Sequence, residues 1–386
     1  MVDSSLLRKF VAPEYIFGIG ARHLAGRYAK NLGARKVMVV SDPGVVNAGW
    51  TQQVIDSLAR EELETTLFTA VSPNPVAEEV MAGAEAYRSS GCNTLVAVGG
   101  GSPIDCAKGI GIVSSNHKHI LTFEGIDQVH SAIPLLICIP TTGGTSADVS
   151  QFAIIRDVQR KTKIAIVSKS VVPDLSLIDP ETLSSMDPYL TACTGMDALT
   201  HAIEAFVSSA HSPMTDLHAL EAIRLLSNHL LPAVNHPDDP HLRSQVMLGS
   251  LQAGLAFSNA ILGATHAMAH SLGGYLDLPH GECNAILLDH VISFNLNTVP
   301  ERFDQIAHAL GMNLSGLPHR QKQLALMKKI RQMKDQSGIN RSLSTLGVSR
   351  SDLPALSETA LRDPCMITNP RQPTKRDIEV IYEEAF

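Results

Sequence analysis

The sequence predicts an α/β amino-terminal half followed by an all-α carboxyl-terminal half. From about residue 35 to residue 180, short β-branched runs alternate with amphipathic segments. After Pro188, apolar residues recur at helical spacing and few strand-like runs remain. The stretch Asp179–Pro188 contains two prolines and several polar residues and interrupts both patterns. We therefore expect two domains, at residues 1–186 and 187–386, and 386 residues are enough for two cores.

The expected strands are continuous apolar runs, which suit a parallel sheet covered on both faces by helices. They lie at Lys36–Val40, Thr94–Val98, Leu135–Ile139, Lys163–Val167 and Leu175–Ile178. The segments between the first few runs suit parallel crossover helices. In the second half, the expected helices lie at Leu190–Ser209, Thr215–Ala233, Leu242–Phe257, Thr265–Tyr275, Glu301–Leu310 and His319–Ser337.

The composition excludes several classes of partner. Lys and Arg number 31 against 38 Asp and Glu, so the net charge is −7, and aromatic residues make up only 4%. No run of like charges suggests a nucleic acid or an anionic membrane as a partner. The first 20 residues lack the pattern of a secretory signal, and no window approaches the ~18 apolar residues of a membrane span, so we expect a cytoplasmic protein. The six cysteines are scattered, which predicts neither disulfides nor a cysteine-based zinc site.

A glycine turn follows the second expected strand. Thr94–Asp105 contains Gly99, Gly100 and Gly101, then Ser102 in position to cap a helix and Pro103 in its first turn. Glycines let a phosphate approach the backbone, and the start of a helix favours its negative charge. The turn is a candidate pyrophosphate cradle. Because it matches neither G-x-G-x-x-G nor a P-loop, a generic tight turn is the alternative.

Two other polar segments are expected at the same edge of the sheet. The hydroxyl-rich loop Pro140–Ser150 follows the run ending at Ile139, and Asp42 follows the first strand. Ligands bind at the carboxyl edge of a parallel sheet, where an acid such as Asp42 can bind the ribose hydroxyls and repel a 2′-phosphate. Each segment is also compatible with an ordinary turn.

A carboxylate and several imidazoles share helical spacing in the second half. Asp197 and His201 are four residues apart, as are His266 and His270, and His280 follows. Nitrogen and oxygen donors of this kind suit a divalent first-row metal such as iron or zinc. Spacing alone leaves open whether His270 or His280 is a ligand. The alternative is that each His is merely a hydrogen-bonded helix residue.

Together these motifs resemble the iron-containing (group III) alcohol dehydrogenase family. The similar stretches run from Phe17–Gly20 through Gly99–Asp105, Pro140–Thr142 and Thr194–Glu204 to Gly254–His290. The resemblance implies a Rossmann-like dinucleotide-binding domain and a helical metal-binding domain of the dehydroquinate synthase-like type. It also implies an active site in the cleft between them.

The resemblance also implies the roles of individual residues. The implied metal ligands are Asp197, His201, His266 and His280, and His270 is implied to lie near the nicotinamide and relay the alcohol proton. The implied cofactor residues are Asp42, Asn74, Gly100, Gly101, Ser102, Thr141, Thr142, Thr145, Ser150 and Lys163. Phe257 and Cys365 match positions that line the substrate pocket. The acid at position 42 favours NAD over NADP.

The expected activity is the NAD-linked interconversion of a small primary alcohol or diol and its aldehyde, with Fe²⁺ or Zn²⁺ bound. The segments Thr145–Ser150 and His270–Gly274 depart from the usual pattern of the family, so the substrate stays open. A homodimer or larger homo-oligomer is also expected, with Phe10–Tyr15 as an edge strand at its interface. The alternatives are a zinc enzyme of the glycerol dehydrogenase type and a non-catalytic regulatory protein that keeps the fold.

Overall fold

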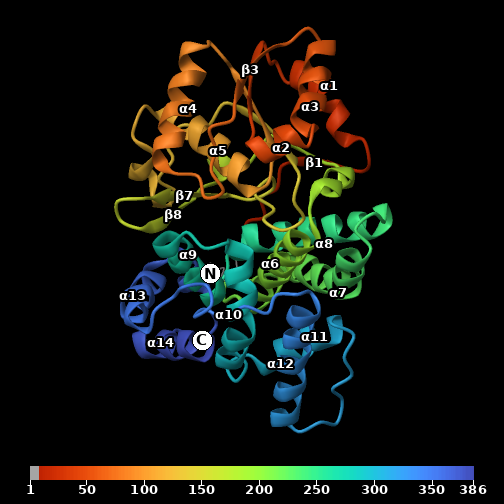
Figure 1. Ribbon diagram of the computed structural model, residues 1–386, viewed down its shortest axis with the longest axis vertical. Helices are drawn as coiled ribbons and strands as arrows, with labels where there is room; N and C mark the ends of the chain where they lie inside the picture. Colours follow the sequence, from red (N-terminus) through yellow and green to blue (C-terminus); the bar gives the residue numbers. More distant parts are fainter. Residues whose placement is uncertain (1–7) are drawn as a thin grey trace, which may run out of the picture.

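The computed structural model describes residues 8–386 and has an α/β layer above a bundle of helices (Figure 1). The main sheet has six strands in the order β1-β9-β6-β4-β2-β3, and all its neighbouring strands are parallel. Its central strands are buried and its edge strands are partly exposed, which explains the apolar runs in the sequence. The strands are β1 (Glu14–Phe17), β2 (Lys36–Val40), β3 (Glu64–Phe68), β4 (Thr94–Gly99), β6 (Leu135–Pro140) and β9 (Leu175–Ile178).

Alternate side chains of the strands face two separate cores. Val37 and Val39 of β2 pack in one cluster, and Met38 and Val40 pack in the other. Helices cover both faces, as a parallel sheet requires. These helices are α1 (Ala25–Asn31), α2 (Pro43–Asn47), α3 (Trp50–Arg60), α4 (Ala77–Ser89) and α5 (Gly101–Asn116).

The strand order creates a switch point beside β2. From β2 the chain crosses outward to β3, whereas β4 lies on the other side of β2 and leads on to β6. The crevice at such a point is where open α/β sheets bind their ligands. Gly99 pairs with Pro140 in the register of β4 and β6, so the glycine turn and the hydroxyl-rich loop leave the sheet side by side.

One expected strand belongs to a different sheet. β8 (Thr162–Val167) pairs antiparallel with β7 (Phe152–Asp157) and parallel with the short β5 (Gly125–Ile126). The short connection from Asp157 to Thr162 folds β8 back onto β7, with Lys161 in the left-handed region at φ 51°. This three-stranded sheet faces α9 of the helical layer (Figure 1).

The second half consists of helices around one large core. The first of these helices begins at Pro188, and Asp187 caps it by accepting a hydrogen bond from Leu190 N at 2.9 Å. The helices are α6 (Pro188–Val207), α7 (Pro213–Asn235), α8 (Pro240–Ala260), α9 (Ala264–Leu276), α10 (His280–Asn295), α11 (Pro300–Ala309), α12 (His319–Gln336), α13 (Leu353–Arg362) and α14 (Lys375–Glu384). Among residues 8–386 no single helix is long and apolar enough to span a membrane, and the pair α8 and α9 reaches that length only with a 98° bend.

The hydroxyl-rich loop joins the two layers. Ser146 Oγ donates to Ser250 O at 2.7 Å, and Gln151 Nε2 donates to Ser258 O at 2.7 Å, so the loop is fixed to α8. Beneath it, the buried Lys108 of α5 donates to Ala147 O at 2.6 Å and to Phe152 O at 2.7 Å. A buried ammonium needs such partners, and these bonds hold the loop between the sheet and the helices.

Candidate active site

Three of the predicted metal ligands meet in the helical layer. Asp197 and His201 lie one turn apart on α6, and His266 lies on the first turn of α9. One ligand atom from each of these residues lies within 4.8 Å of those of the other two, and all three residues are buried. The His201 and His266 rings are stacked, with their centroids 4.4 Å apart. The structure thus brings together residues from two helices that are far apart in the sequence.

His280 joins this cluster from a third helix. It is the first residue of α10, and its Nε2 lies 3.8 Å from Asp197 Oδ1. The next residue, Gly281, allows α10 to approach α6, because a Cβ there would lie 2.6 Å from Cys193 O. Asn284, one turn later, donates to Asp197 Oδ1 at 2.6 Å. The glycine at 281 therefore determines how closely His280 approaches the carboxylate.

The charges of this cluster are strongly coupled. Burial by itself raises the pKa of Asp197, but the imidazoles of His201 and His280 hold it well below its usual range. Burial lowers the pKa of His201 to about 4 against the attraction of Asp197. For His266, burial is outweighed by hydrogen bonds to Asp197 and Glu204, which raise its pKa to about 9. At neutral pH, Asp197 is therefore ionised and His201 is neutral.

Glu204 is a candidate functional residue that sequence reasoning missed. It lies one turn beyond His201 and accepts the Nδ1–H of His266 at 2.7 Å. It also accepts the backbone N–H groups of Gly263 at 3.1 Å and Thr265 at 2.6 Å at the start of α9. The available signal was an acid placed three residues after His201 in an otherwise apolar helix. Because a carboxylate only accepts hydrogen bonds, Glu204 keeps a proton on His266 Nδ1, so Nε2 is the nitrogen that a metal ion can bind once it displaces the second proton.

The donor set fits a divalent metal ion. His266 Nε2 is buried 3.5 Å from Asp197 Oδ1, too far for a well-formed hydrogen bond within residues 8–386, and the raised pKa of His266 means that this nitrogen carries a proton in the metal-free protein. His201 Nδ1 is likewise buried without a partner in that part of the chain. Two acceptor atoms so close together repel each other unless a proton or a cation lies between them. One carboxylate and three imidazoles supply a donor set that iron and zinc both accept.

His270 lies beside this cluster. It follows His266 by one turn on α9, and its ring is stacked on that of His280 with the centroids 5.2 Å apart. Its Nδ1 lies 2.9 Å from Asp363 Oδ2, which sequence reasoning also missed. Burial by itself would raise the pKa of Asp363, but the neighbouring His270 outweighs it and holds this pKa below its usual value. The ionised carboxylate of Asp363 therefore accepts a hydrogen bond from His270 Nδ1. The Nε2 of His270 then keeps its lone pair.

The predicted cofactor loops meet at the edge of the sheet. Thr141 N donates to Gly99 O at 3.0 Å. A Cβ added at Gly100 would lie 3.0 Å from Thr142 Cγ2, and one added at Gly101 would lie 3.1 Å from Thr145 Cγ2. The glycine turn and the hydroxyl residues are thus in direct contact. Gly99 has φ 154°, a value at which a side chain would be strained.

Ser102 does not cap the following helix, contrary to the sequence-based expectation. Helix α5 begins at Gly101 with Gly100 as its N-cap residue, and no side chain satisfies the first N–H groups. The Ser102 hydroxyl donates instead to Pro73 O in the neighbouring loop. Because no side chain caps this end of α5, its N–H groups fit a pyrophosphate.

The remaining predicted cofactor residues differ in their surroundings. Asp42 caps the short helix α2 through Val45 N at 3.0 Å, where the alternative interpretation expected a turn, and its Oδ1 makes this bond. Asn74 Nδ2 donates to Asp277 Oδ1 at 2.6 Å across the two layers. Ser150 is buried beneath the loop, where its Oγ accepts from Lys108 Nζ at 3.4 Å. Lys163 extends from β8 toward α9, because a Cβ at Gly273 would lie 2.9 Å from its Nζ.

The two predicted pocket residues contact different histidines. Phe257, near the end of α8, stacks on His201 with the ring centroids 4.3 Å apart. Cys365 lies in η7 (Pro364–Thr368), and its N–H donates to Asp363 Oδ1 at 2.8 Å. Both residues are buried.

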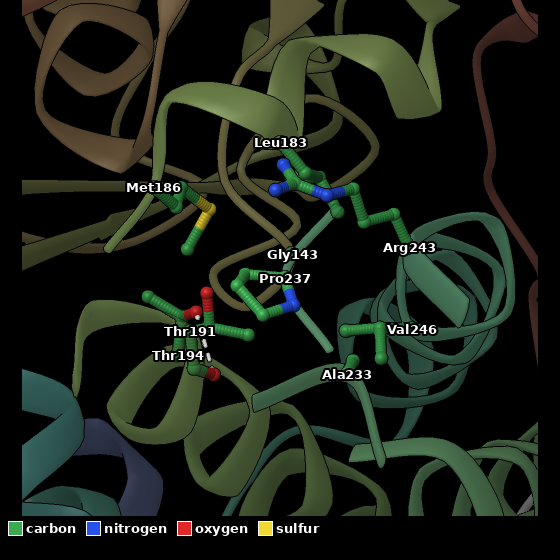
Figure 2. A pocket seen from close by; sticks show the side chains of 9 residues that line it. All are labelled: Gly143, Leu183, Met186, Thr191, Thr194, Ala233, Pro237, Arg243 and Val246. Carbon is green, nitrogen blue, oxygen red and sulfur yellow. Dashed lines mark hydrogen bonds between the residues drawn. The ribbon is translucent and has the colours of Figure 1, made fainter. Parts of the chain in front are cut away.

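A separate pocket lies between the amino-terminal end of α6, η5 (Pro180–Ser185) and α8 (Figure 2). It is small, and its wall includes Leu183, Met186, Thr194 and Arg243. Arg243 Nη1 is buried without a hydrogen-bond partner among residues 8–386, and burial lowers the pKa of this guanidinium. Gly143, which follows the predicted cofactor residue Thr142, also lines the wall. The pocket therefore adjoins the cofactor loop and is distinct from the histidine cluster.

Comparisons with known proteins agree over both halves of the chain. Residues 12–180 match the profile "Iron-containing alcohol dehydrogenase", and residues 191–386 match "Fe-containing alcohol dehydrogenase family, C-terminal". The chain is 38% identical to a 1,3-propanediol dehydrogenase of Citrobacter freundii, covering 96% of each chain. It is also 38% identical to alcohol dehydrogenase 4 of Schizosaccharomyces pombe, covering 98% of this chain and 89% of the relative. A crystal structure of a 1,3-propanediol oxidoreductase superimposes with a TM-score of 0.95 at 37% identity, covering 98% of this chain and 100% of that one.

Proposed function

The chain belongs to the iron-containing alcohol dehydrogenase family and is an oxidoreductase of alcohols and aldehydes, and from that premise we propose its site and cofactors. The proposed reaction interconverts a small primary alcohol or diol and its aldehyde by hydride exchange with NAD. A divalent ion, Fe²⁺ or Zn²⁺, is held by Asp197, His201, His266 and His280. We propose the domain division at residues 186 and 187, beside the Asp187 cap of α6.

The observation that carries the proposal is the buried cluster of one ionised carboxylate with three imidazoles. His266 Nε2 lies 3.5 Å and His280 Nε2 lies 3.8 Å from Asp197 Oδ1, so two imidazole nitrogens and a carboxylate oxygen converge on one buried point. Buried nitrogen and oxygen donors that converge in this way suit a divalent ion, whose binding would displace the proton that His266 holds in the metal-free protein, and the cluster therefore supports a resident metal ion. When bound, the ion supplies Lewis-acid polarisation of the alcohol oxygen, and NAD accepts the hydride.

The side chains of the protein supply orientation and proton transfer. Glu204 holds His266 in one tautomer, and Asp363 does the same for His270. With Nδ1 protonated, the Nε2 of His270 has a lone pair that accepts the alcohol proton during oxidation and returns it during reduction. Phe257 and Cys365 present apolar surface next to these histidines, which favours a short aliphatic substrate.

The cofactor lies over the glycine turn in this proposal. The uncapped start of α5 binds the pyrophosphate, and Thr142 and Thr145 lie against the same turn. Asp42, at the end of the neighbouring strand, keeps one oxygen for the ribose hydroxyls and repels a 2′-phosphate, which favours NAD.

We also propose a homodimer or larger assembly. β1 lies at one edge of the six-stranded sheet, with Tyr15 42% exposed. An edge strand presents unpaired backbone groups, which a second copy of the chain can pair. Light scattering of the purified protein tests this part, and a monomer would refute it.

The test combines metal analysis with rates. Protein purified without oxygen is assayed for bound iron and zinc, and NADH formation or consumption is followed with short primary alcohols, diols and aldehydes. The His280→Ala variant is expected to lose the metal and the activity together, because one of four ligands is removed. Activity in metal-free protein, or metal retained at full stoichiometry in this variant, would refute the ligand assignment. Bound NAD and metal without turnover on any of these substrates would favour a regulatory protein.

A further inference from the structure

A second cluster of potential metal ligands lies next to the first. Among residues 8–386, only two groups of three or more His, Cys, Asp or Glu side chains have ligand atoms within 4.8 Å of one another. One contains Asp197, and the other is formed by His270, Asp363 and Cys365. The side chains of His270 and Asp363 are 8% and 7% exposed, and Cys365 is fully buried. The two clusters adjoin through the stacked rings of His270 and His280.

We propose that His270, Asp363 and Cys365 form a second, inhibitory binding site for a thiophilic divalent cation, above all Zn²⁺. The donors are one nitrogen, one carboxylate oxygen and one sulfur, and the thiolate distinguishes this set from the oxygen and nitrogen donors of the first cluster. Soft sulfur ligands select zinc over iron and magnesium. A tetrahedral ion held by three side chains keeps one position for water.

The charges of this second cluster match a dication. On binding, the Cys365 thiol loses its proton to solvent, the carboxylate of Asp363 is already ionised, and no electrons are transferred. One thiolate and one carboxylate then balance the two positive charges, so a neutral assembly is buried. The first cluster is balanced similarly by Asp197 and Glu204, which limits the repulsion between two neighbouring ions.

Rigid positioning favours this cluster further. Asp363 is fixed by accepting Cys365 N through Oδ1 at 2.8 Å, while Oδ2 faces His270 Nδ1 at 2.9 Å. This carboxylate therefore already faces the imidazole, and the sulfur is two residues further along in η7, which Asp363 caps. Little conformational entropy is lost when an ion replaces the hydrogen bond.

Inhibition follows from the chemistry of the imidazole, and this part rests on the proposed role of His270. When Nδ1 binds a cation, the ring proton moves to Nε2. Nε2 then donates a hydrogen bond and has no lone pair for the alcohol proton. The ion therefore blocks proton transfer while the first metal stays in place.

Cobalt distinguishes the two sites, because only the second contains sulfur. Metal-stripped protein is titrated with Co²⁺ without oxygen, and a near-ultraviolet thiolate-to-cobalt charge-transfer band is expected as the second equivalent binds. Zinc-loaded protein should show a Zn–S distance of about 2.3 Å by X-ray absorption. Both signals should vanish in Cys365→Ala and persist in Cys106→Ala, a control whose cysteine is equally buried in α5. Asp363→Asn, which keeps the thiol, should weaken the second equivalent without abolishing the first.

Inhibition is measured on iron-loaded enzyme, as the ratio of rates with and without added Zn²⁺ for each variant. The inhibition constant is expected to rise by roughly a hundredfold or more in Cys365→Ala, because a direct ligand is lost. No thiolate band in the unmodified protein, or a band that survives in Cys365→Ala, would overturn the site. If the band is present but zinc inhibits both proteins equally and displaces iron, the inhibitory role fails. If Cys106→Ala no longer binds the first equivalent of Co²⁺, then a cysteine substitution far from both clusters disrupts the protein in general. That result would also count against the assignment.

Discussion

Replacing Glu204 by Gln tests whether this carboxylate positions His266, one of the proposed metal ligands. Glu204 accepts three hydrogen bonds of 3.1 Å or shorter, from Gly263 N, Thr265 N and His266 Nδ1, and it is 3% exposed. An amide keeps the size but replaces one acceptor oxygen by an NH₂ group, so the Nδ1–H of His266 loses its carboxylate partner. The carboxylate then no longer holds the proton on Nδ1, so Nε2 is no longer kept available for the metal ion.

The expected loss is worked from these contacts. Carboxylate partners of metal-bound histidines typically contribute 10- to 100-fold to metal affinity, so the dissociation constant should rise by that factor, or about 1.4–2.8 kcal/mol. The metal-free protein should also lose about 2–3 kcal/mol of unfolding free energy, because hydrogen bonds to a buried charge are weakened. Chelator competition gives the metal affinity, and denaturant unfolding of metal-free protein gives the stability.

Asp289→Asn provides a matched control. Its carboxylate is 2% exposed and pairs with Arg331 at 2.5 Å, but it lies away from the histidine cluster on α10. This variant should lose stability and keep its metal affinity. An unchanged metal dissociation constant in Glu204→Gln, or an equal change in both variants, would refute the positioning role.

Three further predictions concern the cofactor, the proton and acid stability. Asp42→Gly should lower KM for NADP by about tenfold or more, because it removes a negative charge that repels the 2′-phosphate. The control Asp56→Asn on α3 should leave the preference for NAD unchanged. Initial rates with NAD and NADP measure this preference in both variants. His270→Ala should keep its first metal equivalent and lose about 10²–10⁴-fold in kcat, and a metal-free variant or an unchanged kcat would contradict this role. The stability of metal-free protein should be greatest near pH 6.5. Between pH 9 and 6.5 it rises as pH falls, because the pKa of folded His266 is raised to about 9. Below pH 6.5 it falls, because the pKa of folded His201 is lowered to about 4 and that of folded His280 is also lowered, and each group contributes up to about 1.4 kcal/mol per pH unit. Denaturant unfolding at pH 5, 6.5 and 9 measures the free energy of unfolding on both sides of this maximum. A free energy of unfolding that changes in one direction across the three pH values would contradict the prediction.

The sequence by itself determined the two architectures and most of their elements. Continuous apolar runs identified β2, β4, β6 and β9 to within a residue or two, because buried parallel strands need apolar side chains on both faces. Helical spacing identified α6 to α9, since one apolar stripe suffices for packing. The edge strand β3 escaped this reasoning, because its exposed residues dilute the apolar signal. The edge strand expected at Phe10–Tyr15 overlaps β1 (Glu14–Phe17) only at Glu14 and Tyr15.

The metal cluster was only partly visible in the sequence. Spacing paired Asp197 with His201 and His266 with His270, because residues four apart share a helix face. It left His270 and His280 equivalent, and resemblance to a family was needed to choose between them.

Only the tertiary structure decided which partners each histidine has. Glu204 faces His266 because α6 and α9 pack together, and Asp363 faces His270 although 93 residues separate them. Gly281 lets α10 approach α6 so that His280 lies 3.8 Å from the Asp197 carboxylate. Periodicity encodes which face of an element is buried, whereas these contacts depend on how separate helices are oriented against one another. That orientation is set by packing across the whole core, so no local stretch of sequence contains it.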